Sequence, residues 1–257
     1  MSDEILTLPP PAADARIAYG TDSNQFGDIR LPKTKSPFPI VMNIHGGFWR
    51  AKYDLTHAGH LCAALTARGL ATWNIEYRRV GNPGGGWPGT FEDIRNAYRF
   101  LPQIAKRYNA SSTKTLVMGH SSGGQLALCL AAHEPSIKNV ISLAGVVDLQ
   151  QAFELHLSNN AVVEFLGGTP KEVPEHYREA DPMDLSISHA TTQWLIHGAS
   201  DDIVPSYFSR GYAEQKKRKG EDVHYSEIST ADHFALIDPR SRAWSTVEST
   251  VLHLLSF

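Results

Sequence analysis

Short apolar runs alternate along the chain with longer amphipathic segments. Six runs have the length and composition of buried strands, at 40–44, 70–75, 115–118, 139–143, 193–196 and 223–228. Segments with helical spacing lie between or after them, at 56–68, 91–108, 125–133, 206–219 and 240–255. Strands that are apolar on both faces and separated by helices are typical of a mainly parallel sheet covered on both sides. The pattern therefore predicts an α/β fold.

One interval, 150–188, breaks this alternation. It carries helical patches separated by glycines and prolines, among them Gly167, Gly168 and Pro174. We expect a small helical insert over one end of the sheet, within a single domain that covers 1–257. Ligands in such folds bind outside the carboxyl ends of the strands, so the insert would form one wall of a pocket.

The net charge of the chain and the length of its apolar stretches argue against nucleic-acid and membrane partners. The chain has 257 residues with 24 Lys and Arg against 27 Asp and Glu, so it lacks the basic excess that nucleic-acid binding requires. Its longest apolar stretches, such as 140–147, are far shorter than the roughly 18–20 residues that span a bilayer. The amino terminus lacks the order of charges and apolar residues of a secretory signal. We expect a cytoplasmic protein with a small-molecule substrate and no membrane partner; the oligomeric state stays open, with a homodimer as one candidate.

The segment GHSSG, at 119–123, fits the pattern G-x-S-x-G. It lies between a predicted strand and a predicted helix, which is the context of a nucleophile elbow. The sharp turn would present Ser121 above the sheet as a nucleophile, and the neighbouring Ser122 would offer its backbone N–H. A phosphate-binding loop is disfavoured because no Lys-Ser/Thr pair follows these glycines.

A second glycine turn, HGGFW at 45–49, directly follows the strand predicted at 40–44. Acyl transfer needs preorganised donors where negative charge develops on the carbonyl oxygen. A loop of this type can turn its backbone N–H groups toward a nucleophile on the neighbouring strand. We interpret it as an oxyanion loop.

A serine nucleophile needs a base, and the base needs a carboxylate. In hydrolases with this elbow the acid and then the base follow the serine in the sequence, in loops after late strands. Asp201 and Asp202 follow the strand predicted at 193–196, and His233 follows the last one. We take His233 as the base because His224 falls within a predicted strand and His253 on the last predicted helix. The spacing leaves Asp201 and Asp202 both open as the acid.

Three aromatic residues, Trp49, Tyr77 and Trp87, fall in or beside loops at the predicted carboxyl edge. They would either line a substrate site or close the top of the core. His57 and His60 lack nearby residues to complete a metal site, so we expect no metal.

The run 216–219 ends a predicted helix, where four cations suit the helix dipole and solvent. Cys62 and Cys129 lie in apolar helical segments, where a thiol behaves as a small buried hydrophobe.

Together, the chain resembles α/β-hydrolases of the HGG-W type, close to bacterial carboxylesterases and kynurenine formamidases. Hormone-sensitive-lipase-like enzymes and prolyl oligopeptidase catalytic domains are more distant. The resemblance rests on YGTDSNQFGDIRLP, HGGFW, EYRR, GHSSGG, HGASDDIVP and ADHFALID, which occur in this order. It implies Asp201 as the triad acid and the backbone N–H groups of Gly47, Phe48 and Ser122 as oxyanion donors.

The function that we expect is that of a serine carboxylesterase with short acyl groups, because the insert is short for a lipase lid. The alternative is a kynurenine formamidase that uses the same triad on N-formylkynurenine. A non-catalytic ligand receptor on this fold is a minor alternative, because such proteins typically lose a triad member. No cofactor is expected for any of them.

Overall fold

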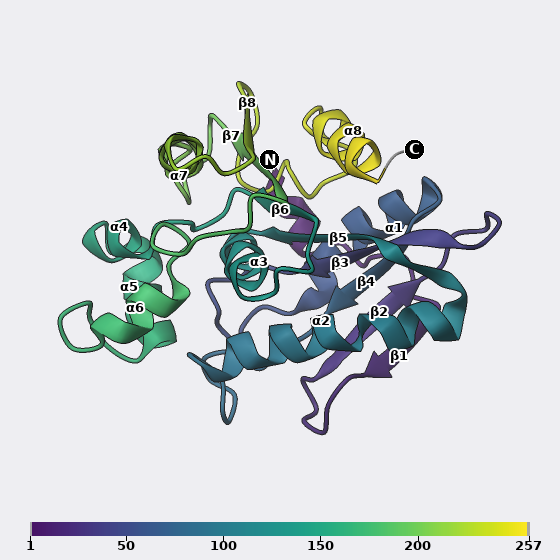
Figure 1. Cartoon of the computed structure of the whole chain (residues 1–257), viewed down its shortest axis with the longest axis horizontal. Helices are drawn as coiled ribbons and strands as arrows, with labels where there is room; N and C mark the ends of the chain where they lie inside the picture. Colours follow the sequence, from purple (N-terminus) through teal and green to yellow (C-terminus); the bar gives the residue numbers. More distant parts are fainter. Residues whose placement is uncertain (1, 256–257) are drawn as a thin grey trace.

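The computed structural model, which describes residues 2–255, is built on one eight-stranded sheet (Figure 1). The strands are β1 (Ala15–Ala18), β2 (Phe26–Arg30), β3 (Phe38–Ile44), β4 (Ala71–Ile75), β5 (Ala110–His120), β6 (Asn139–Leu143), β7 (Thr192–Gly198) and β8 (Val223–Ile228). Their order is β1-β2-β4-β3-β5-β6-β7-β8. The pairs β1–β2 and β2–β4 are antiparallel, and all the others are parallel. The predicted α/β class, with a mainly parallel sheet, is confirmed.

Helices cover both faces of the sheet and divide the core into two clusters. α2 (Gly89–Tyr108), α3 (Ser122–His133) and α7 (Tyr207–Arg218) pack on one face, and α1 (Gly59–Ala67) and α8 (Trp244–Leu254) on the other. Successive side chains of a strand point to opposite faces. In β3, accordingly, Met42 belongs to the first cluster and Val41 to the second. The parallel strands can therefore be apolar at every position.

All six predicted strands are present, and β6 and β8 have the predicted bounds. The interval 150–188 contains most of α4 (Leu149–Glu154), together with α5 (Leu157–Leu166) and α6 (Pro174–Ala180), between β6 and β7. The sequence pattern did not predict β1 and β2, nor the short 3-10 helices η1 (Ser2–Leu6) and η2 (Leu55–Ala58). The segment predicted as a helix at 56–68 is divided between η2 and α1.

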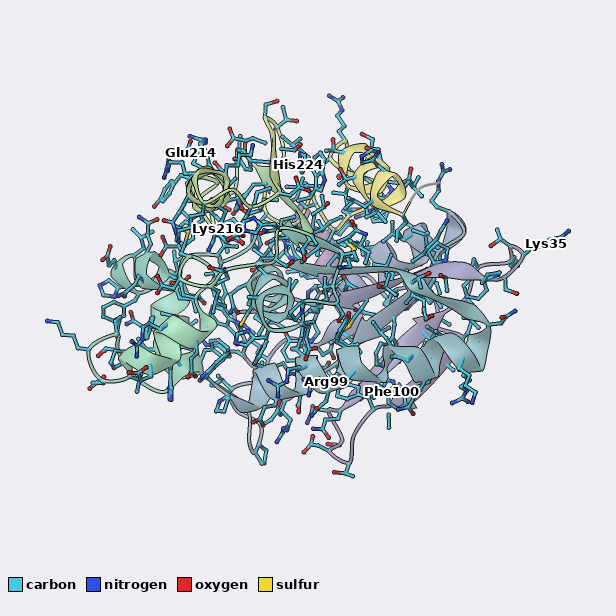
Figure 2. All side chains as sticks on the ribbon, viewed as in Figure 1. Lys35, Arg99, Phe100, Glu214, Lys216 and His224 are labelled. Carbon is cyan, nitrogen blue, oxygen red and sulfur yellow. The ribbon has the colours of Figure 1, made fainter. Side chains whose placement is uncertain are left out.

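We expected the four cationic side chains at 216–219 to be exposed to solvent, but one of them, at the end of α7, is not. Lys216 is fully buried, and Figure 2 shows it on the side of α7 that faces the body of the molecule, whereas Glu214 lies on the outer side. Its Nζ donates to the carbonyls of Met183 and Leu185, which lie near the end of the insert. Burial lowers the pKa of the Lys216 ammonium. Lys216 therefore anchors the last part of the insert to α7.

Both cysteines are buried and free. Within residues 2–255, no helix is both long enough and apolar enough to cross a membrane.

Candidate active site

The strand β5 and the helix α3 meet at Ser121, which adopts φ 57° and ψ −123°. Its backbone N–H donates to the carbonyl of Leu143 on β6 at 2.8 Å. Glycine is required on both sides: a Cβ at Gly119 would lie 2.1 Å from the carbonyl oxygen of Gly123, and one at Gly123 would lie 2.2 Å from that of Ile44. The positive φ of Ser121 is a strained backbone conformation for a non-glycine residue, and the surrounding structure must hold it. This strained turn presents the Ser121 side chain at the carboxyl end of the sheet.

The loops after β7 and β8 bring a carboxylate and an imidazole together. Asp201 Oδ2 lies 2.7 Å from His233 Nδ1, and both side chains are almost fully buried. The other oxygen, Oδ1, accepts from the backbone N–H groups of Ile203 at 2.9 Å and Val204 at 2.8 Å. A carboxylate held at both oxygens is fixed in orientation and can in turn orient the ring.

A second histidine, His197, shares the Asp201 carboxylate. Its Nε2 lies 3.2 Å from Asp201 Oδ2, and its Nδ1 lies 2.8 Å from Ser209 Oγ. Burial by itself would raise the pKa of Asp201, but the hydrogen bonds from His197 and His233 and the charge of His233 lower it below its usual range. Asp201 is therefore ionised wherever the protein is folded near neutral pH. Asp202, the other candidate acid, is exposed and lines a neighbouring depression.

The oxyanion loop has an unusual backbone. Gly47, Phe48 and Trp49 have φ of 120°, 49° and 58°. A Cβ at Gly47 would meet the Tyr53 Cβ at 2.5 Å, so only glycine fits there. The loop is joined to the elbow because the Trp49 N–H faces Ser122 Oγ at 3.4 Å. Ser122 is the first residue of α3 and is fully buried.

A cavity of about 130 Å³ lies against Ser121, and Gly47, Phe48 and His233 also line it. The structure therefore brings the predicted nucleophile, the predicted base and two of the expected oxyanion residues to one space. The described contacts include no hydrogen bond between the Ser121 hydroxyl and the His233 ring; such bonds are often long without substrate. The rest of the lining is Leu6, Tyr53, His57, His120, Ser158, Ile203 and Phe234.

Of the two interpretations open for Trp49, Tyr77 and Trp87, the structure favours closing of the core over lining of the site, because none of them borders this cavity. Trp49 and Tyr77 are buried in the core. The Trp49 indole N–H donates to Gln125 and its ring stacks on Phe165. The Tyr77 hydroxyl donates to the carbonyl of residue 45. Trp87 stacks on Phe91. A polar partner inside the protein satisfies the tips of the two buried rings, so they close the core.

The sequence pattern did not predict several of the residues that line the cavity. Leu6 comes from η1 at the amino terminus, Ser158 from the insert, and Ile203 and Phe234 from the loops that carry Asp201 and His233. The last two are neighbours of the predicted triad in the sequence, and that proximity was a usable signal. No local pattern indicated Leu6 or Ser158, because tertiary packing brings them to the site.

His120, which precedes Ser121 in the sequence, links two loops of the site, and the sequence pattern did not predict this. Its Nε2 lies 2.9 Å from the carbonyl oxygen of His233, which accepts the hydrogen bond. Burial and, after it, the charge of His233 lower the pKa of His120 well below its usual value. A neutral His120 therefore ties the loop of the base to the elbow.

An elbow serine at the carboxyl end of a mainly parallel sheet, with an acid and a histidine on later loops, defines an α/β-hydrolase. The chain belongs to the BD-FAE family, whose model matches residues 28–215.

Similar proteins include esterases and formamidases. The esterase LipC of Mycobacterium tuberculosis is 25% identical over 93% of this chain, and the chain spans only 64% of its length. A kynurenine formamidase of Danio rerio is 24% identical over 86% of this chain and 75% of its own length. A truncated carbohydrate esterase from gut microbiota superposes with a TM-score of 0.83, at 19% identity, over 97% of this chain and all of that one. At that identity the superposition shows the fold alone.

Proposed function

We propose that the protein is a serine hydrolase that cleaves esters of short carboxylic acids through an acyl-enzyme. The observation that carries this proposal is the 2.7 Å contact between Asp201 and His233 beside a cavity that Ser121 and His233 both line. Relatives named esterases, LipC among them, support the same reaction class.

The tautomer of His233 supports its role as the base. A carboxylate can only accept, so His233 Nδ1 carries the proton toward Asp201. His233 Nε2 then keeps its lone pair and can take the proton of Ser121 as Oγ attacks the carbonyl carbon. The same proton passes to the leaving alcohol, and water repeats the sequence to release the acid. Asp201 holds the ring and stabilises the imidazolium.

The tetrahedral intermediate carries its negative charge on the former carbonyl oxygen. We assign the backbone N–H groups of Gly47, Phe48 and Ser122 as its donors. Ser122 begins α3, whose unpaired N–H groups and dipole favour an anion there. Phe48 also lines the cavity.

The size and chemistry of the cavity favour short acyl groups. A dry cavity of roughly 150 Å³ holds one benzene-sized molecule, and this one is about 130 Å³. Apolar side chains from Leu6, Phe48, Ile203 and Phe234 form much of its wall. An acyl chain too long for the cavity would extend beyond this apolar wall or displace part of it.

A formamide is the second candidate substrate. The relatives named kynurenine formamidase, from Danio rerio and Drosophila melanogaster, each match over 86% of this chain and 75% of their own length. Formyl is the smallest acyl group and fits the same cavity.

The test is the turnover of p-nitrophenyl acetate and N-formylkynurenine by purified protein, with Ser121→Ala as the control. We expect the ester to have the higher kcat/KM and the variant to retain only background. A formamide preference of orders of magnitude would make the protein a formamidase. Labelling with a fluorophosphonate and peptide mapping should find the adduct on Ser121, and an adduct elsewhere would refute the assignment.

A further inference from the structure

The ring of His45, at the start of the oxyanion loop, lies between two acceptors. Its Nδ1 is 2.7 Å from the carbonyl oxygen of Gly46, and its Nε2 is 3.0 Å from Oε1 of Glu76. A carbonyl oxygen only accepts, so Nδ1 must donate. The protonation of His45 then depends on whether Glu76 is ionised.

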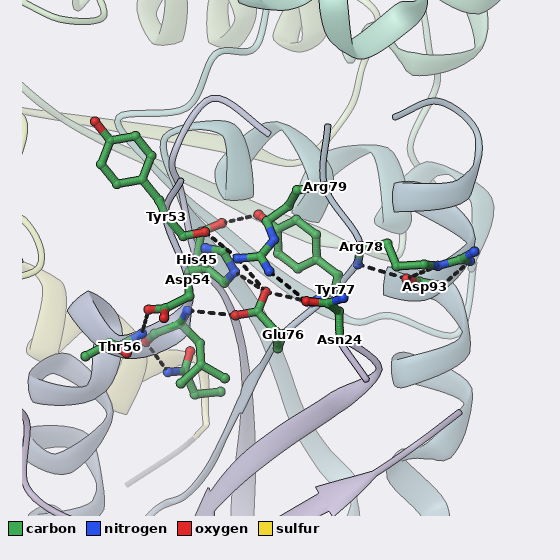
Figure 3. Close-up of polar contacts among 12 residues, drawn as sticks. Asn24, His45, Tyr53, Asp54, Thr56, Glu76, Tyr77, Arg78, Arg79 and Asp93 are labelled. Carbon is green, nitrogen blue, oxygen red and sulfur yellow. Dashed lines mark hydrogen bonds and ion pairs between the residues drawn. The ribbon is translucent and has the colours of Figure 1, made fainter. Parts of the chain in front are cut away.

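The surroundings of Glu76 are those of a carboxylate (Figure 3). Besides His45, its Oε1 accepts from the Tyr77 N–H at 2.9 Å and pairs with Arg79 at 3.0 Å. Its Oε2 accepts from the Leu55 N–H at 3.1 Å. The two backbone N–H groups and the Arg79 guanidinium can only donate, and an ionised carboxylate accepts from all three. With only donors around it, Glu76 accepts from His45 as well.

We propose that His45 is a buried imidazolium, donating from both ring nitrogens, and that it positions the oxyanion donor Gly47. The carbonyl of Gly46 and the N–H of Gly47 belong to one peptide unit, which is planar and trans, so the two groups point in opposite directions. When His45 binds the carbonyl from one side, the Gly47 N–H is directed away from His45. Gly47 borders the cavity.

The loop needs such a restraint. Gly47, Phe48 and Trp49 all lie at positive φ, a conformation that persists only where neighbouring structure imposes it. A cation hydrogen-bonded to the Gly46 carbonyl also polarises the peptide and strengthens its N–H as a donor. His45 therefore acts through Gly47 and is a positioning residue.

The groups around His45 are compatible with a cation there. Tyr77 stacks on the ring at 4.5 Å, and His57 meets it edge-on at 5.7 Å. The charged groups near the His45 ring are the carboxylates of Glu76 and Asp54 and the guanidinium of Arg79. Burial and the charge of His45 lower the pKa of His57 to about 3, so His57 is neutral. Glu76, Tyr77 and Arg79 thus surround the histidine that begins the oxyanion loop.

This inference rests on the proposed function, but its first test does not require activity. In protein labelled with ¹⁵N at the histidine rings, His45 should show two protonated nitrogens at pH 7.5. The signals are assigned by their loss in His45→Gln. A wild-type His45 with one unprotonated nitrogen overturns the inference.

The second test is kinetic. Glu76→Gln should lower kcat by roughly 30- to 100-fold with KM within about 3-fold, because oxyanion donors act mainly in the transition state. Asp93→Asn is the matched control: Asp93 is another buried carboxylate, paired with Arg78 at 2.7 Å and lacking contact with His45 or the cavity. It should be less stable to heat but keep kcat within about 3-fold.

The outcomes separate the two proposals. Equal losses of kcat in Glu76→Gln and Asp93→Asn, or an unchanged kcat in Glu76→Gln, overturn the role of His45. Full activity in Ser121→Ala instead overturns the proposed function and leaves the protonation result standing.

Discussion

The Oδ2 atom of Asp201 lies 2.7 Å from Nδ1 of His233, across 32 residues of sequence that include α7 and β8. The parallel pairing of β7 with β8 aligns the ends of these strands and so brings their following loops side by side. The positions of Asp201 and His233 thus depend on the register of the sheet, and the hydrogen bonds of Asp201 to its own loop fix the orientation of its carboxylate.

Asp201→Asn should reduce kcat by about 10³- to 10⁴-fold, because an amide can hold the wrong tautomer of His233 and stabilises no imidazolium. Asp202→Asn is the matched control, since Asp202 is exposed and the described contacts include no hydrogen bond or ion pair between it and His233. It should keep kcat within about 3-fold. Steady-state kinetics on p-nitrophenyl acetate would measure both, and a larger loss in Asp202→Asn would reassign the acid.

Leu6 sets the expected limit on acyl length. It comes from η1, which is anchored by the buried Ile5, and it borders the cavity. Leu6→Ala should raise the ratio of kcat/KM for hexanoate over acetate by about 10-fold, since a methylene accommodated in an apolar pocket is worth about 1–3 kcal/mol. Leu8→Ala is the control, because Leu8 packs on the same core cluster but lies outside the cavity wall. An unchanged ratio in Leu6→Ala would exclude η1 from acyl selection.

The pKa of His57 predicts how stability depends on pH. Burial, then the charge of His45, lower this pKa from 6.5 to about 3. Between these values the unfolded chain binds a proton that the folded protein does not, so stability is lost as the pH falls through this window. Relative to His57→Gln, the free energy of unfolding of the wild type should fall by up to about 1.4 kcal/mol per pH unit below 6.5. Urea titrations from pH 7.5 to 4.5 would measure it; parallel pH profiles would contradict it.

Periodicity was sufficient for the parallel strands and most helices, because these strands are apolar on both faces. It failed for β2, whose Asp28 and Arg30 are buried charges. Asp28 pairs with Arg16 on β1, and Arg30 donates to the carbonyl of Pro11. These long-range contacts make a polar segment suitable for a sheet, and no local pattern reveals them.

In the candidate site too, the sequence predicted some residues correctly and could not place others. Motifs with a fixed backbone requirement, such as the turn at Ser121 and the loop at Gly47, could be found in the sequence because glycine is needed there. The positions of the aromatic rings could not. Tyr77 and Trp49 are buried through partners 32 and 76 residues away, so only the folded chain distinguishes the core from the cavity.

Arg50 joins the oxyanion loop to the insert. Its guanidinium binds both oxygens of Glu164, at 2.7 and 2.9 Å, and donates to Ser158 Oγ at 3.0 Å. Ser158, Asn159 and Asn160 lie at φ of 50°, 56° and 59°, a conformation that surrounding contacts must maintain. The cavity wall at Ser158 therefore depends on this arginine.

Arg50→Met should raise KM by about 5- to 10-fold and leave kcat within about 3-fold, because it disturbs a binding wall and leaves the reacting groups in place. The loss of stability should stay below about 1 kcal/mol, since the ion pair is partly exposed. Arg210→Met, which breaks an ion pair of the same 2.7 Å length with Glu227 away from the cavity, should leave KM unchanged. A fall in kcat at constant KM in Arg50→Met would instead mean that Arg50 supports the oxyanion loop, and the insert would then have no part in binding through this contact.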